Sequence, residues 1–135
     1  MVQTTQAGKR PISPHLQIYR PTINMVMSIL HRITGVILYA GTLLLAWWLI
    51  AIATGPDYYA FVNSILASIP GKIVLLGYTW ALMHHMLGGI RHFIWDTGRG
   101  FELTMVNMLS WLTIIGSLGL TALIWFVGLK LHGVL

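Results

Sequence analysis

The sequence contains no cysteine and very little charge, and each of these absences excludes several classes of protein. Of its 135 residues only 8% are Asp, Glu, Lys or Arg, whereas an average soluble domain carries about 25%. Such a chain lacks the polar side chains that would cover a globular surface in water, which excludes a soluble enzyme and a disordered protein. The lack of cysteine excludes disulfides, iron–sulfur ligation by this chain, thiolate zinc sites and cysteine nucleophiles.

Acidic residues are particularly scarce, with three Asp and Glu against eight Lys and Arg, for a net charge of +5. The basic residues form no dense tract, so nucleic acid is excluded as a partner. What the chain has instead is hydrophobic sequence, 56% of all residues, together with six histidines. The length allows one small domain, which we expect to be a helical bundle in a lipid bilayer.

Three uncharged apolar runs, residues 33–54, 73–90 and 103–129, are each long enough to cross a membrane. A hydrocarbon core of about 30 Å requires about 20 residues at about 1.5 Å per residue. Because three segments cannot close a barrel, and lipid leaves no backbone group unpaired, the spans must be helices. The predicted division is a polar segment at 1–21, membrane helices at 22–54, 72–95 and 104–130, an outer loop at 55–71 and a cytoplasmic loop at 96–103.

The outer loop carries apolar residues at helical spacing between residues 57 and 68. This pattern predicts a short amphipathic helix in the interface, with an apolar loop as the open alternative.

The basic residues predict the orientation of the chain. Six of them precede the first span or lie between the second and third, and two lie on the other side. The N-terminus is therefore expected on the cytoplasmic or matrix side. The six are Lys9, Arg10, Arg20, Arg32, Arg91 and Arg99, and the two are Lys72 and Lys130.

Three polar residues gather at the start of the first span, where Ser28 and Arg32 are four residues apart and His31 lies between them. Residues four apart share one helical face, so Ser28 and Arg32 can contact the same ligand. An arginine near a helix end also commonly extends to lipid headgroups. Three polar side chains within five residues favour a polar site over an anchor.

Two adjacent histidines, His84 and His85, lie deep in the second span. Adjacent helical residues project about 100° apart, so only one of the two can face a given ligand. His85, Gly89 and His92 share a stripe, in which glycine leaves a hollow beside the histidine. Close helix packing and a plain interfacial belt are the alternatives for this stripe.

The depth of these residues places both clusters in one leaflet, because His85 lies about 10 Å below His92 by helical rise. A neutral histidine, a small neighbour and nearby cations suit a b-type haem, in which imidazole binds iron and cations offset the propionates. Met83 and Met86 are weaker candidate ligands, because methionine is a common filler of apolar surfaces.

Three motifs in this order resemble the cytochrome b subunit family of succinate dehydrogenase (complex II). They are residues 10–16, RPISPHL, residues 28–35, SILHRITG, and residues 85–96, HMLGGIRHFIWD. The third span matches only in position and hydrophobicity.

The resemblance implies an all-α membrane anchor of three helices, half of a haem-binding bundle that a second anchor subunit completes. It implies docking of iron–sulfur and flavoprotein subunits, so this chain would not oxidise succinate alone, and reduction of ubiquinone at the membrane surface. His85 would be an axial ligand of haem b, with the other ligand from the second anchor. Ser28 and Arg32 would bind quinone, and His31 and Arg32 would lie on the propionate side.

Three other functions compete with this interpretation. One is the anchor of a fumarate reductase, and a second is an anchor whose haem is dispensable. The third, from a different class, is a small proton channel or transporter that uses His31, His84 and His85 as a relay. The short basic N-terminal segment favours a bacterial inner membrane over a mitochondrial one.

Overall fold

The structure, a computed structural model, describes Pro14 and residues 18–133. Within this part of the chain every regular element is an α-helix, as the sequence predicted. Most of the first motif, residues 10–13 and 15–16, lies outside the described residues, as does most of the predicted polar segment 1–21. The helices are α1 (Ile23–Thr54), α2 (Pro56–Ala67), α3 (Ile69–Asp96) and α4 (Leu103–Leu131).

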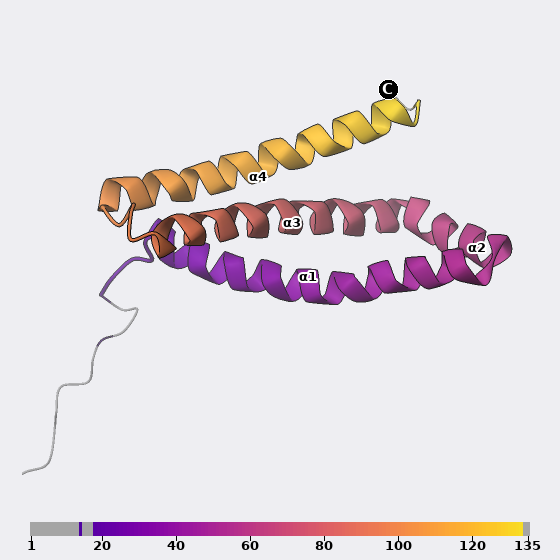
Figure 1. Cartoon of the computed structure of the whole chain (residues 1–135), viewed down its shortest axis with the longest axis horizontal. Helices are drawn as coiled ribbons and strands as arrows, with labels where there is room; N and C mark the ends of the chain where they lie inside the picture. Colours follow the sequence, from indigo (N-terminus) through magenta and orange to yellow (C-terminus); the bar gives the residue numbers. More distant parts are fainter. Residues whose placement is uncertain (1–13, 15–17, 134–135) are drawn as a thin grey trace, which may run out of the picture.

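The three long helices α1, α3 and α4 are long and apolar enough to cross a membrane. Figure 1 shows α3 between α1 and α4, and the short α2 joining α1 to α3 at one end. The last helix diverges from α3 toward its C-terminal end (Figure 1). The start of α1 and the end of α3 lie together at the other end of the bundle, which we call the histidine end.

Local sequence signals set the bounds of α2, where the sequence left a helix or a loop open. Gly55 separates α1 from α2 with a φ of 135°, which side chains other than glycine rarely adopt. Pro56 then occupies the first helical position, where its missing N–H is no loss. The Ser68 hydroxyl accepts a hydrogen bond from the Gly71 amide at 3.2 Å and caps α3. As a result α3 begins at Ile69, three residues before the predicted start of the second span.

The connection from α3 to α4 is a tight loop. Gly98 and Gly100 have φ values of 75° and 78°, and the Trp95 indole donates to the Gly100 carbonyl at 3.1 Å. This bond and the two glycine turns hold the end of α3 close to the start of α4.

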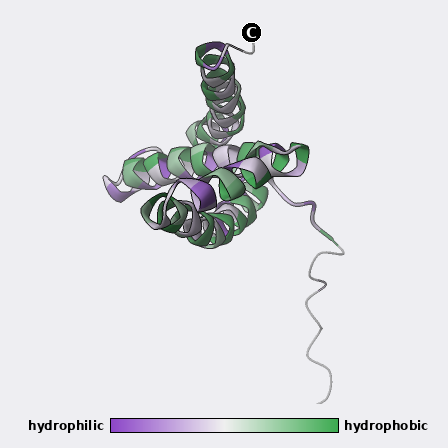
Figure 2. Ribbon diagram, turned by 90° about the vertical axis from the view of Figure 1, so that its right-hand side faces the viewer, coloured by the Kyte–Doolittle hydropathy of each residue, from purple (hydrophilic) through white to green (hydrophobic). Residues whose placement is uncertain are grey.

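The described residues bury more polar than apolar side chains, which reverses the pattern of a soluble protein. Four hydrophobic side chains are buried, whereas large hydrophobic ones are exposed along every helix. Figure 2 shows hydrophobic residues all around the helices. In lipid, where apolar contact between helices gains little, small polar side chains hold the helices together. The buried polar side chains are Thr34, His84, Arg91, Ser110, Thr113, Ser117 and Thr121.

Candidate functional site

Two glycines let α1 and α3 approach closely at the histidine end. Gly88 of α3 lies against the His31 ring, and a Cβ at this position would overlap that ring. Gly35 of α1 lies against His85, whose Cε1 would be 3.2 Å from an added Cβ. Each imidazole therefore fits into a space left by a glycine of the facing helix.

Three imidazole rings gather at this contact. The rings of His31 and His85 are nearly parallel, with centroids 4.0 Å apart and an interplanar angle of 7°. The His92 ring lies 5.2 Å from the His31 ring and 5.3 Å from the Trp95 ring. The structure thus brings together His31 and His85, which are 54 residues apart in the sequence, and adds His92.

Hydrogen bonding fixes the tautomer of His85. Its Nδ1 lies 3.1 Å from the His31 carbonyl oxygen and 3.3 Å from the Thr34 hydroxyl. A carbonyl can only accept, so Nδ1 carries the proton and Nε2 keeps its lone pair. Among the described residues no hydrogen bond engages Nε2. Nor is Nε2 of His85 among the buried side-chain atoms of the described residues that lack a partner.

The side of α3 that carries His85 also has open space. An added Cβ on Gly89 would meet no neighbouring atom within 4 Å in the described part of the chain. The described part of the chain therefore leaves the space beside Gly89 unfilled, and a hollow that holds a ligand there stays a prediction. An imidazole whose Nδ1 bonds to a backbone carbonyl and whose Nε2 is free can bind haem iron, and the small Gly89 beside it would leave room for the haem.

Ser28 and Arg32 lie on the exposed side of α1, next to the face that carries His31. The structure gives neither side chain a hydrogen bond to another described residue. Ser28 and Arg32 are one turn apart on α1, so their polar groups point to the same region outside this chain. The structure therefore places the predicted quinone residues beside the imidazole cluster and turned outward.

His84 lies on the opposite side, between α3 and α4. It is 1% exposed, its Nδ1 is 3.3 Å from the Ser117 hydroxyl, and its ring lies 5.2 Å from Trp80. The Nε2 atom of His84 is buried with no partner among the described residues. The 100° offset thus directs the adjacent histidines to different helices, and it leaves only His85 with open space beside it.

A buried arginine is the main feature that the sequence did not locate. Arg91 is 3% exposed, donates to the Ser110 hydroxyl at 3.1 Å, and has its guanidinium carbon 5.0 Å from the Trp95 ring centroid. The Ser110 hydroxyl shares its one proton between the Asn24 side-chain oxygen at 2.8 Å and the Val106 carbonyl at 2.9 Å. This network joins α1, α3 and α4 one turn before Ser28.

A repeated signal in the last helix could have revealed this packing. Ser110, Thr113, Ser117 and Thr121 recur at spacings of three and four residues, and all four are buried. Their hydroxyls bond to carbonyls of their own helix, which satisfies them in lipid and leaves small surfaces for close contact.

Comparison with known proteins gives a consistent set of matches. Residues 6–130 match the family model described as succinate dehydrogenase/fumarate reductase transmembrane subunit. The chain is 42% identical over 127 residues to the succinate dehydrogenase cytochrome b556 subunit of Rickettsia felis, covering 93% of this chain and 99% of that one. It is 42% identical over 123 residues to the protein of the same name from Paracoccus denitrificans, covering 89% and 95%. The mitochondrial cytochrome b560 subunit of Sus scrofa is 34% identical over 124 residues, with 86% of this chain and 72% of that one covered.

Proposed function

Because the chain belongs to the family of succinate dehydrogenase/fumarate reductase transmembrane subunits, we propose that it holds one side of a b-type haem and part of a ubiquinone-reduction site. Family membership makes the chain a cytochrome b membrane anchor of the respiratory chain, with its role in electron transport. The electron acceptor, the haem contacts and the partner subunits are the proposed part.

The observation that carries the proposal is the bond from His85 Nδ1 to the His31 carbonyl at 3.1 Å. It holds the ring in the tautomer whose Nε2 can bind iron, and it makes that nitrogen more basic. His31 and Arg32, at the same end, would lie on the propionate side. When bound, the haem supplies a one-electron redox centre. We expect the second ligand from a second anchor subunit, because His85 is the one imidazole of the described residues whose Nδ1 bonds to a backbone carbonyl.

For the quinone, Ser28 and Arg32 supply the two kinds of group that reduction requires. A quinone carbonyl oxygen becomes negatively charged as electrons arrive, and fixed donors stabilise that charge most strongly where water is scarce. Arg32 provides a permanent cation and Ser28 a hydroxyl donor from the same side of α1. Both side chains are exposed in the isolated chain. We expect a docked iron–sulfur subunit and the second anchor to cover them and so exclude water.

The orientation and partners follow from the same placement. The N-terminus and the histidine end are proposed to face the cytoplasm of a bacterial cell, with the chain crossing the inner membrane three times. The iron–sulfur subunit would deliver electrons there from a flavoprotein that oxidises succinate. The family description covers both directions of this reaction, and we propose succinate oxidation because the relatives are named succinate dehydrogenase subunits.

A proton relay through His31, His84 and His85 is not favoured. His84 bonds to Ser117 on the α4 side of α3, whereas His31 and His85 stack on the α1 side. The three rings therefore form no continuous chain.

The test compares two electron acceptors in membranes that contain the assembled complex. We expect Ser28→Ala or Arg32→Leu to lower succinate–ubiquinone reductase activity about 100-fold, the usual effect of losing one anion-stabilising donor. Succinate oxidation by a soluble artificial acceptor should persist, because the flavoprotein is unchanged. Arg99→Leu removes an exposed cation from the loop at the same end and should leave both activities intact. Unchanged quinone reduction in both site variants would refute the assignment of Ser28 and Arg32.

A further inference from the structure

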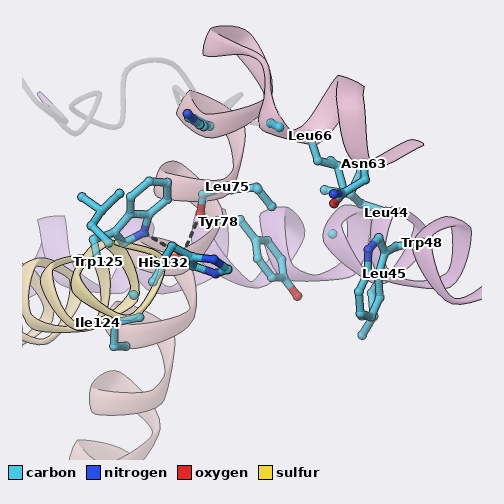
Figure 3. Close-up of a pocket in the computed structure, with 16 residues that line it drawn as sticks. Leu44, Leu45, Trp48, Asn63, Leu66, Leu75, Tyr78, Ile124, Trp125 and His132 are labelled. Carbon is cyan, nitrogen blue, oxygen red and sulfur yellow. Dashed lines mark hydrogen bonds between the residues drawn. The ribbon is translucent and has the colours of Figure 1, made fainter. Parts of the chain in front are cut away.

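A cavity of about 730 Å³ lies at the end of the bundle opposite the imidazole cluster. Side chains from all four helices line it, and Figure 3 shows the Tyr78 ring between Trp48 of α1 and Trp125 of α4. This volume is within the range of about 300–1,000 Å³ that is usual for small-molecule sites. The haem and quinone residues of the proposed function do not contribute to it.

Two glycines line this cavity. Gly41 of α1 has the Tyr78 ring packed directly against its Cα, where a Cβ would overlap the ring. Gly128 of α4 lines the cavity on the other side, and an added Cβ there would meet nothing within 4 Å in the described chain. The Trp125 indole donates to the Thr79 hydroxyl at 3.3 Å and closes the inner part of the wall. This bond joins α4 to α3 at one point, and beyond it the two helices diverge and leave the cavity between them.

Three polar side chains line the part of the cavity that lies at the helix ends, and Tyr78 and Thr79 add hydroxyls from further along α3. Lys72 is in the first turn of α3, and His132 caps the C-terminus of α4. Asn63 of α2 is the third polar residue at this end. Within the described residues no carboxylate lies within 4 Å of the Lys72 ammonium group. The cavity therefore offers a mainly apolar wall, with the Lys72 ammonium group at its rim and no described carboxylate paired with it.

We propose that this cavity binds one membrane phospholipid with an anionic headgroup. Its acyl chain would lie against Leu75, Tyr78 and Trp125, and its phosphate would face Lys72, with Asn63 and His132 as hydrogen-bonding groups. Basic residues at the ends of membrane helices attract anionic headgroups, and an apolar slot between diverging helices accepts an alkyl chain. A neutral isoprenoid tail would use the slot but would leave the Lys72 charge without a partner. The lipid would hold α4 against α1 and α2.

The first experiment fills the cavity and counts the lipid. The full chain, with whatever it assembles with, is purified from its host membrane in mild detergent, and bound phospholipid is measured by native mass spectrometry. Gly128→Leu should remove one phospholipid per chain. Gly119→Leu is the matched control, because Gly119 is on the same helix, also has open space beside it, and does not line the cavity.

The second experiment tests the charge. The delipidated complex is exchanged against vesicles of phosphatidylglycerol or phosphatidylcholine, and retained lipid is counted. Lys72→Gln should reduce the preference for phosphatidylglycerol about fivefold, the effect expected for one lysine near a membrane surface. Lys130→Gln removes a cation from the same end, outside the cavity, and should leave the preference unchanged.

Lipid content that is the same in Gly128→Leu and Gly119→Leu would overturn the proposal, as would loss of ubiquinone rather than phospholipid. Normal quinone reductase activity in Gly128→Leu would leave the proposed function intact, so the two hypotheses fail separately.

Discussion

The two sides of α3 use the same kinds of residue in opposite ways. On the α1 side, His85 keeps a nitrogen available, Gly89 leaves open space, and Arg32 of the facing helix turns outward. On the α4 side, His84 and Arg91 are almost fully buried and bond to serines of α4. The polar side chains on the α4 side therefore hold helices together, whereas those on the α1 side stay available for a ligand.

This difference matters because burying a polar side chain in a membrane span costs free energy, and such residues are therefore commonly taken as functional. Here His84 and Arg91 have a structural role, which their burial and their hydrogen bonds to serines of α4 identify. The variants below test whether the two sides differ as described, beginning with the largest expected effect.

Removal of the two adjacent histidines should give opposite results. His85→Ala should abolish the b-type absorption band of the reduced complex, because loss of a direct ligand costs more than the 10–100-fold in affinity that loss of its supporting partner costs. His84→Ala should keep the band, because that ring contacts Ser117 and Trp80. Reduced-minus-oxidised spectra of membranes with equal amounts of assembled complex provide the measurement. A band that survives His85→Ala but disappears in His84→Ala would reverse our assignment.

A side chain at Gly89 tests whether the open space is used by a ligand. In the described part of this chain an added Cβ on Gly89 meets no atom within 4 Å, so we attribute a loss of haem in Gly89→Leu to a group outside these residues. We expect haem content to fall at least tenfold while the subunit is still inserted. Gly77→Leu is the control, because Gly77 lies on the same helix, also with open space beside it, three turns from Gly89. Equal haem content in both variants would show that the space beside Gly89 is not part of the site.

The sequence predicted the large features of the fold because they depend on local properties. Apolar length identified three spans, and the 100° offset required His84 and His85 to face different directions. Which helix each would face depends on contacts between residues far apart, such as Asn24 and Ser110, which are 86 residues apart. Single-sequence periodicity carries no information about such pairs.

The site was predicted in part for the same reason. His31, Arg32 and His85 are conspicuous because charge and imidazole are rare in a span. Thr34, whose hydroxyl lies 3.3 Å from His85 Nδ1, belongs to the motif of residues 28–35, but nothing in the sequence predicted its contact with His85. Arg91 was noticed as a cation, but its burial against α4 depends on tertiary packing.

The Arg91 network should have a moderate effect on stability. Ser110→Ala removes the hydroxyl that accepts from Arg91 and donates to Asn24, and it leaves the guanidinium buried with its Nε already without a described partner. Leaving a buried donor unsatisfied costs about 1–3 kcal/mol. We expect the complex to lose its haem at a lower temperature, with an unchanged spectrum below that temperature. A spectrum altered at low temperature would instead connect Arg91 directly to the haem site.

The smallest effect is expected at Ser117, whose hydroxyl makes one contact with His84 at 3.3 Å. Hydrogen bonds between membrane helices contribute about 0.6 kcal/mol on average, so Ser117→Ala should lower the melting temperature of the complex only slightly, and less than Ser110→Ala. Alanine keeps the small surface that lets α4 approach α3, and the haem spectrum should not change. Ser117→Leu is the informative companion, because its bulk would separate α4 from α3 at His84 while leaving the α1 side untouched. If Ser117→Leu lowers stability but retains the b-type band, the α4 side is structural. If it removes the band without affecting stability, the division between the two sides of α3 is wrong.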